Sequence, residues 1–225
     1  MLSGMSVEQV AEDVCLLTGR PGYRINQYLI RDVLIDSGTP AAARRLLRDI
    51  EGRTIVAHAI THAHPDHYGS SKALSRRLHL PFWCPSDDVD ALESRRLPHS
   101  ELLLGRLIGL PPGPAGPRIA RRLREGDEVA GFRVLDTPGH SPGHVSYWRE
   151  TDGVLIVGDV AFNVAPLSGQ VGLREPPAFM TVDPARNRES IRRLAALEPT
   201  LALFGHGPPL RDPAAWRTFA TGLLA

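Results

Sequence analysis

Short apolar runs of strand length alternate along this chain with longer segments in which apolar and charged residues mix. Ile55–Thr61 is mostly apolar and β-branched, which is typical of a strand covered on both faces of its sheet. Glycine, proline and aspartate separate the later runs, as expected for turns between short strands. Further strands are predicted at Ile25–Ile30, Val33–Ile35, Pro81–Cys84, Phe132–Asp136, Val145–Trp148, Val154–Val157 and Leu201–Phe204.

Two predicted helices carry clear start signals. Thr39 precedes a proline and an Ala/Arg/Leu run, so we predict a helix over Thr39–Ile50 with Thr39 as its cap. Asp183 stands in the same place before a helix that extends to about Leu197. Other helices are predicted at Gly69–Leu78 and Pro213–Leu224.

The pattern changes between residues 87 and 118. Asp87–Arg96 and His99–Ile108 are expected to form two short helices, and residues 110–117 are rich in proline and glycine. Proline removes backbone donors and fixes φ, so this stretch cannot continue a regular element. The alternation of strands and helices then resumes. We therefore predict a single domain over residues 1–225, with a helical, lid-like insertion at 87–118.

Length and charge limit the function classes. The chain has 225 residues, of which 26 are Lys or Arg and 25 are Asp or Glu. This balance provides no basic surface of the kind that binds nucleic acid, so no such partner is expected. No apolar run approaches the roughly 20 residues of a membrane span, and no signal-peptide pattern opens the sequence. With only two cysteines, Cys15 and Cys84, a cytoplasmic protein without membrane association is expected.

The nine histidines are not scattered evenly. His62, His64, Asp66 and His67 lie within six residues, directly after the predicted strand Ile55–Thr61. Because side chains alternate along an extended segment, His62 and His64 point to the same side and can bind one ion together. The proline that follows bends the chain, so that Asp66 and His67 can face a second ion nearby. The segment therefore predicts a metal site.

Three further metal-capable residues stand in similar places. His140, Asp159 and His206 each come after an apolar strand and close to a glycine. Glycine lets the backbone bend tightly beside a ligand, and the carboxyl ends of strands are where α/β sheets place ligand sites. We therefore expect these three side chains to converge with the histidine-rich segment.

This combination resembles the metallo-β-lactamase superfamily, whose pattern is HxHxDH followed by His, Asp and His at later strand ends. Residues 137–144, TPGHSPGH, are similar to a signature of its glyoxalase II-like branch. The resemblance implies an α+β fold: an αββα sandwich, in which two mixed sheets lie face to face with helices outside, and a dinuclear site at one edge.

The resemblance also implies individual roles. The implied ligands are His62, His64 and His140 for one ion, Asp66, His67 and His206 for the other, and Asp159 for both. Asp36 would support the metal-binding loop, and His144 would lie beside the metals without binding one. Nitrogen and oxygen ligands suit two zinc ions per chain and leave iron or manganese open.

A hydrolase follows as the implied activity, with a metal-bridging hydroxide attacking the carbonyl of a small ester, thioester or lactone. Asp66 is expected to carry the proton. Penicillin-hydrolysing members lack the bridging Asp159, and the chain ends soon after His206, where glutathione thioesterases carry a helical extension. The alternatives are a mononuclear iron enzyme similar to persulfide dioxygenases and a non-hydrolytic metal-binding member.

A small-molecule substrate would enter a pocket that the loops shape. Phe162, Phe179 and Met180, together with the leucine-rich segment 102–110, are expected to make it partly apolar. For any one of these residues, ordinary contact with the core is an equally good interpretation. Exposed apolar residues in the insertion would favour a homodimer, so both a monomer and a homodimer are compatible with the sequence.

Overall fold

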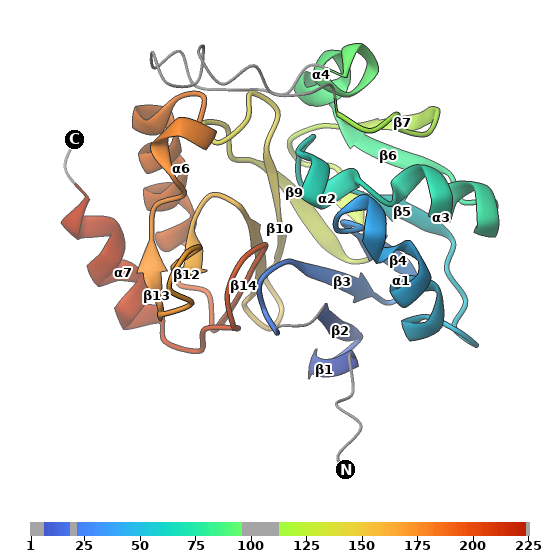
Figure 1. Cartoon of the computed structure of the whole chain (residues 1–225). Helices are drawn as coiled ribbons and strands as arrows, with labels where there is room; N and C mark the ends of the chain where they lie inside the picture. Colours follow the sequence, from blue (N-terminus) through green and yellow to red (C-terminus); the bar gives the residue numbers. More distant parts are fainter. Residues whose placement is uncertain (1–6, 19–21, 96–112, 224–225) are drawn as a thin grey trace.

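The computed structural model describes residues 7–18, 22–95 and 113–223, and its strands form two large sheets (Figure 1). The first sheet contains, in spatial order, β1 (Val7–Ala11), β2 (Val14–Thr18), β3 (Asn26–Ile30), β4 (Val33–Ile35), β5 (Ala57–Ala59), β6 (Phe82–Pro85) and β7 (Ile119–Leu123). The second contains β14 (Leu201–Phe204), β11 (Val154–Gly158), β10 (Val145–Arg149), β9 (Phe132–Asp136) and β8 (Glu128–Val129). A separate hairpin pairs β12 (Phe162–Val164) with β13 (Val171–Arg174).

Both large sheets are mixed, as expected. Strands β1 to β4 are antiparallel and β4 to β7 are parallel. In the second sheet only β11 and β14 run parallel. His62, His64 and His67 follow the parallel strand β5, and His206 follows the parallel strand β14.

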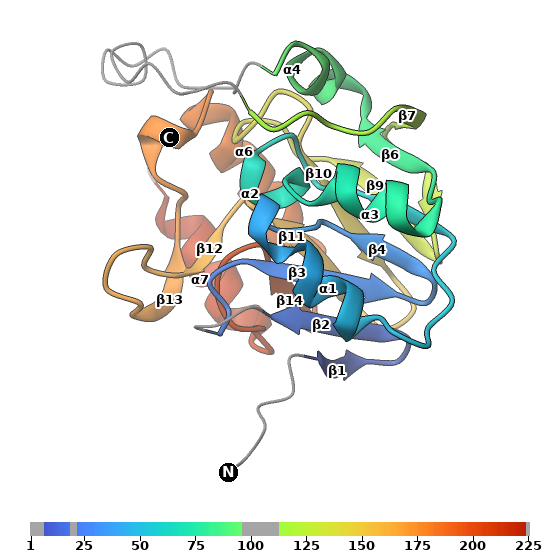
Figure 2. The same cartoon turned by 45° about the vertical axis from the view of Figure 1, so that its right-hand side comes forward.

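Helices cover the two outer faces. Figure 1 shows α6 and α7 on one side of the sheets and α1 and α3 on the other, and in Figure 2 the latter pair lies in front of the first sheet. The helices are α1 (Ala43–Asp49), α2 (Pro65–Tyr68), α3 (Ser71–Leu78), α4 (Val89–Ser94), α6 (Pro184–Ala195) and α7 (Pro213–Gly222).

The hydrophobic core has three layers that follow the alternation of side chains along the strands. In β11, Val154 and Ile156 belong to the central layer between the sheets, whereas Leu155 and Val157 contact the layer beneath α6 and α7. On the opposite outer face, Leu46 of α1 and Leu74 of α3 complete a third layer against the first sheet. The predicted αββα sandwich is thereby confirmed.

Several boundaries differ from the sequence prediction. The Thr39 side chain makes no capping hydrogen bond, and a 3-10 turn, Pro40–Ala42, precedes α1. The predicted strand Ile55–Thr61 pairs only at Ala57–Ala59, because its last residues already turn into the histidine-rich loop. By contrast, Asp183 caps α6 as predicted, accepting a hydrogen bond from the Arg186 amide.

Part of the lid-like insertion lies outside the described residues. The first predicted helix is present as a 3-10 turn, Ser86–Asp88, followed by α4. The second, His99–Ile108, and the leucine-rich segment are not described. Among the described residues, no helix is both long and apolar enough to cross a membrane.

Candidate metal centre

All seven predicted ligand residues meet at one edge of the sandwich. His62 and His64 follow β5, and Asp66 and His67 lie on the short helix α2. The β9–β10 loop and the segments after β11 and β14 supply the others, which are His140, Asp159 and His206. Four segments far apart in sequence therefore meet because the strands before them end at the same edge.

The first group is made of three imidazoles. The Nδ1 atom of His64 lies 2.9 Å from Nε2 of His62 and 3.0 Å from Nε2 of His140. Three nitrogens on one tetrahedral zinc ion, each at about 2.0–2.1 Å, would lie roughly 3.3 Å apart. Because the observed separations are close to this value, the group could hold one metal ion.

A second group lies beside the first. His206 Nε2 is 3.3 Å from Oδ2 of Asp66, and His67 Nε2 is 3.9 Å from the same oxygen. These three residues also form a set that could hold an ion. Two adjacent groups of three are thus present, and their members are the residues that the family resemblance implies for the two ions.

Asp159 lies between the two groups. Its Oδ2 atom is 3.2 Å from His206 Nε2 and 3.3 Å from His67 Nε2. On the other side it is 3.5 Å from His140 Nε2 and 3.9 Å from His62 Nε2. One carboxylate oxygen therefore faces both groups of ligand atoms.

Four of the five clustered histidines are oriented by a hydrogen bond at the ring nitrogen that faces away from the centre. The Nδ1 acceptors are Thr61 Oγ1 for His62, Asp36 Oδ2 for His67, Thr181 Oγ1 for His140 and the Arg24 carbonyl for His206. Such partners fix the tautomer and leave Nε2 for a metal ion. Asp36 also accepts from the amide and hydroxyl of Thr61, so it holds the loop as expected.

Without metal, the cluster separates into neutral and charged imidazoles. Burial, reinforced by neighbouring imidazoles, holds the pKa of His62 and of His140 well below the ordinary value. Burial also opposes charge on His206, but the carboxylates of Asp159 and Asp66 outweigh it and raise the pKa of His206 to about 10. The pKa of His67 is likewise raised, against burial, by nearby carboxylates.

His144 has neither ring nitrogen left for a metal ion. Its Nε2 accepts the Asp159 amide at 2.9 Å, and its Nδ1 is 2.9 Å from Thr137 Oγ1. Burial lowers the pKa of His144 to about 3, so the ring is neutral. Gly158, at φ +62°, allows this approach because a Cβ there would stand 2.6 Å from His144 Nε2. His144 therefore positions the Asp159 backbone.

Asp88 was not predicted as a site residue, yet it joins two of the ligand loops. Its fully buried carboxylate accepts hydrogen bonds from the Ala63 amide at 2.7 Å, the Ser141 hydroxyl at 2.8 Å and the Gly143 amide at 2.7 Å. Ala63 separates His62 from His64, and Ser141 follows His140. In the sequence, Asp88 lies in an ordinary acidic stretch, so no local signal distinguished it.

We expect His58, buried on the outer face of β5, to make stability pH-dependent. Its ring contacts the Leu34 carbonyl and the Ser71 hydroxyl, and burial lowers its pKa to about 4. In the unfolded chain this imidazole takes up a proton near pH 6.5, whereas in the folded protein it does so only near pH 4. The free energy of unfolding is therefore unaffected by this group above pH 6.5 and falls as the pH is lowered from 6.5 to 4, by about 3 kcal/mol in total.

Urea unfolding of His58→Gln between pH 7 and 4.5 measures this effect. The variant should lose less stability on acidification than the native protein. Exposed His79 provides the matched control, because His79→Asn should keep the native pH dependence. Parallel curves for the native protein and His58→Gln would contradict the assignment.

A cavity of about 250 Å³, here called the His206 cavity, borders the second group. Phe162 and Met180 line it as predicted, together with Asp66 and His206. The Phe162 ring also contacts the His206 ring, with centroids 4.4 Å apart and the two planes tilted by 49°. Phe179 is not among the lining residues and is 45% exposed, so the structure does not support its predicted place in this pocket.

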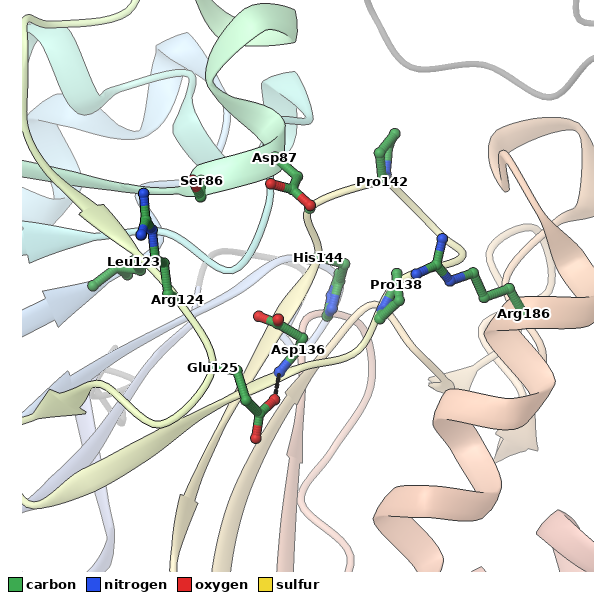
Figure 3. Close-up of a pocket in the computed structure, with 11 residues that line it drawn as sticks. Ser86, Asp87, Leu123, Arg124, Glu125, Asp136, Pro138, Pro142, His144 and Arg186 are labelled. Atoms are coloured by element: carbon green, nitrogen blue, oxygen red, sulfur yellow. Dashed lines mark hydrogen bonds between the residues drawn. The ribbon is translucent and has the colours of Figure 1, made fainter.

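Another cavity, of about 390 Å³, lies at the β9–β10 loop (Figure 3). Arg186 of α6 and Asp87 border it, and His144 reaches its wall. None of the seven predicted ligand residues lines it. Of the two cavities, only the His206 cavity reaches the candidate metal centre.

Comparison with known proteins agrees with this architecture. The sequence profile of the metallo-beta-lactamase superfamily matches residues 20–206. The probable metallo-hydrolase YflN of Bacillus subtilis is 31% identical over 205 residues, which cover 79% of this chain and 76% of that protein. The hydroxyacylglutathione hydrolase of Xanthomonas campestris is 32% identical over 193 residues, covering 82% of this chain and 59% of that protein.

The crystal structure of TTHA1623 in a di-iron-bound form is also similar. It superposes with a TM-score of 0.63 at 32% identity, covering 87% of this chain and 93% of that one. The profile match, the relative above 30% identity and the shared fold all agree with the arrangement of histidines and aspartates at the sheet edge. The chain belongs to the metallo-β-lactamase superfamily.

Proposed function

We propose that this protein is a dinuclear metal-dependent hydrolase, with zinc as its metal, acting on small esters, thioesters or lactones. The observation that carries the proposal is the position of Asp159 Oδ2, within 3.9 Å of imidazole nitrogens from both groups of ligand atoms. A carboxylate in this position is suited to join two cations.

Unsatisfied atoms in the cluster fit a metal centre. His67 Nε2 and Asp159 Oδ1 are buried and have no hydrogen-bond partner among the described residues. Leaving such atoms unpaired is costly unless a ligand is present. The donors are imidazole nitrogens and carboxylate oxygens, which suit Zn²⁺ and do not exclude iron. Two bound ions would lower the pKa of a water molecule toward about 7 and polarise a substrate carbonyl.

The protein's own groups supply positioning and proton transfer. Asp66 lines the His206 cavity, whereas Asp159 is only 2% exposed. Asp66 is therefore the cluster carboxylate that can take the proton from the attacking water and return it to the leaving group. The hydrogen bonds at Nδ1 hold the imidazoles in place, and the apolar wall at Phe162 and Met180 limits water beside the substrate.

The relatives support hydrolysis and leave the substrate open. YflN is named a probable metallo-hydrolase, and the Xanthomonas protein a hydroxyacylglutathione hydrolase. The second name, together with the TPGHSPGH segment, supports a glyoxalase II-like thioesterase chemistry. Because this chain covers only 59% of that protein, glutathione itself is not part of the proposal.

A substrate panel tests the proposal. Protein loaded with zinc, iron or manganese should hydrolyse at least one of a series of esters, thioesters and lactones that includes compounds with and without a carboxylate, and a chelator should remove the activity. Readdition of metal should restore it. Oxygen uptake with a persulfide by iron-loaded protein, without hydrolysis, would contradict the proposal, as would metal binding without turnover of any substrate.

A further inference from the structure

Seven of the ten residues that line the His206 cavity are apolar. These seven come from three places in the chain: the residue before β3, the β12 strand with its following turn, and the segment before α6. The apolar lining residues are Ile25, Phe162, Val164, Ala165, Pro166, Pro177 and Met180. Such a lining suits a hydrocarbon portion of a substrate.

Arg24 is the exception in this lining. Apart from Asp66 and His206, which belong to the candidate metal centre, it is the only polar residue among the described residues that border the cavity. Its backbone carbonyl accepts the Nδ1 hydrogen of His206. The same residue therefore orients a candidate ligand and places a positive charge beside the substrate cavity.

One edge of the Arg24 guanidinium is held and the other has no partner among the described residues. Nη1 donates to the carbonyl of Pro166 at 3.0 Å, and Pro166 also lines the cavity, so this bond joins the segment before β3 to the β12–β13 turn. In contrast to Arg188 and Arg193, each paired with a glutamate, Arg24 has no carboxylate partner in the described part of the chain. Its Nε and Nη2 form the edge that matches a planar carboxylate.

We propose that Arg24 binds a carboxylate of the substrate, which makes short-chain monoesters or monothioesters of dicarboxylic acids the preferred substrate class. This inference rests on the proposed hydrolase function. The hydrocarbon segment occupies the His206 cavity, the scissile carbonyl faces Asp66 and His206, and the carboxylate pairs with Nε and Nη2 of Arg24. At about 250 Å³, the cavity is smaller than the roughly 300–1,000 Å³ of sites for drug-sized ligands, so a short chain fits.

Two matched thioesters of one neutral thiol test the selectivity. The glutaric acid monothioester and the pentanoic acid thioester have equal chain lengths, and only the first carries a carboxylate. The native protein should have the higher kcat/KM for the glutaric compound. Arg24→Gln should reduce the ratio of the two kcat/KM values about 10- to 100-fold, as expected for loss of a charge-assisted bidentate contact.

Arg174 of β13 provides the control, because it also donates to backbone carbonyls of the hairpin but does not line the cavity. Arg174→Gln should keep the native ratio. A native protein without preference for the glutaric compound, or an Arg24→Gln variant with the native ratio, would overturn the inference.

A binding measurement separates this inference from the proposed function. If the metal-loaded protein hydrolyses neither thioester, the hydrolase proposal fails for this substrate class. Calorimetric titration of the same protein with free glutarate and free pentanoate then decides the role of Arg24. Tighter binding of glutarate that is lost in Arg24→Gln and kept in Arg174→Gln supports it, and equal affinities in the native protein refute it.

Discussion

Replacing Asp159 with asparagine is expected to lower hydrolysis about 1,000-fold, equivalent to about 4 kcal/mol of transition-state stabilisation. The asparagine keeps the size of the side chain and removes its charge. In the native protein this carboxylate faces imidazole nitrogens of both groups at 3.2–3.9 Å. A neutral amide would hold two cations together poorly, so metal retention should fall as well.

The measurement is kcat/KM on the best panel substrate together with metal content after dialysis. Asp90→Asn, at an exposed position on α4, is the matched control and should behave as the native protein. An Asp159→Asn variant that retains two ions per chain and activity within tenfold of the native level would contradict the role given to Asp159.

Asp88→Asn is expected to produce the second large effect, on both stability and metal affinity. Both carboxylate oxygens accept hydrogen bonds, from Ala63 and Ser141 at Oδ2 and from Gly143 at Oδ1. An amide at this place must turn its NH₂ group toward at least one of these donors. We expect a loss of about 2–3 kcal/mol in the free energy of unfolding, because a buried donor is left unpaired.

Metal affinity should fall about 10- to 100-fold in the same variant, since Asp88 holds the loops that carry the ligands. Denaturant unfolding and competition with a chelator measure the two quantities. The neighbouring residue provides the control: Asp87 is exposed, and Asp87→Asn should change neither. Unchanged stability and metal affinity in Asp88→Asn would show that these hydrogen bonds do not organise the centre.

The local sequence predicted a strand well where a run of apolar residues is bounded by residues typical of turns. The runs Val33–Ile35, Phe132–Asp136 and Leu201–Phe204 are strands with the predicted bounds. The prediction that Thr39 caps the first helix was wrong, because the chain forms a 3-10 turn after Thr39 before α1 begins. The hairpin of β12 and β13 was not predicted, because its strands have only three and four residues and β13 is partly exposed.

The candidate ligands could be predicted because they follow apolar strands, and the carboxyl ends of those strands meet at one edge. Of the residues that orient them, Asp36 was predicted from the family resemblance and the others were not. Thr181 comes from a segment just before α6, and Asp88 from the 3-10 turn before α4. Their contacts depend on how distant segments lie against each other, and a single sequence carries no record of that. Phe179 is an error of the opposite kind, because it was predicted to line the pocket and does not line the His206 cavity.

The central claim is that one carboxylate and two groups of ligands form a dinuclear hydrolytic centre. Titration of zinc into the chelated protein, with bound metal and thioester hydrolysis measured at each step, tests it most directly. We predict saturation at two ions per chain, with most of the activity appearing as the second ion binds. Saturation at one ion with full activity, or binding of two ions without any hydrolysis, would contradict it.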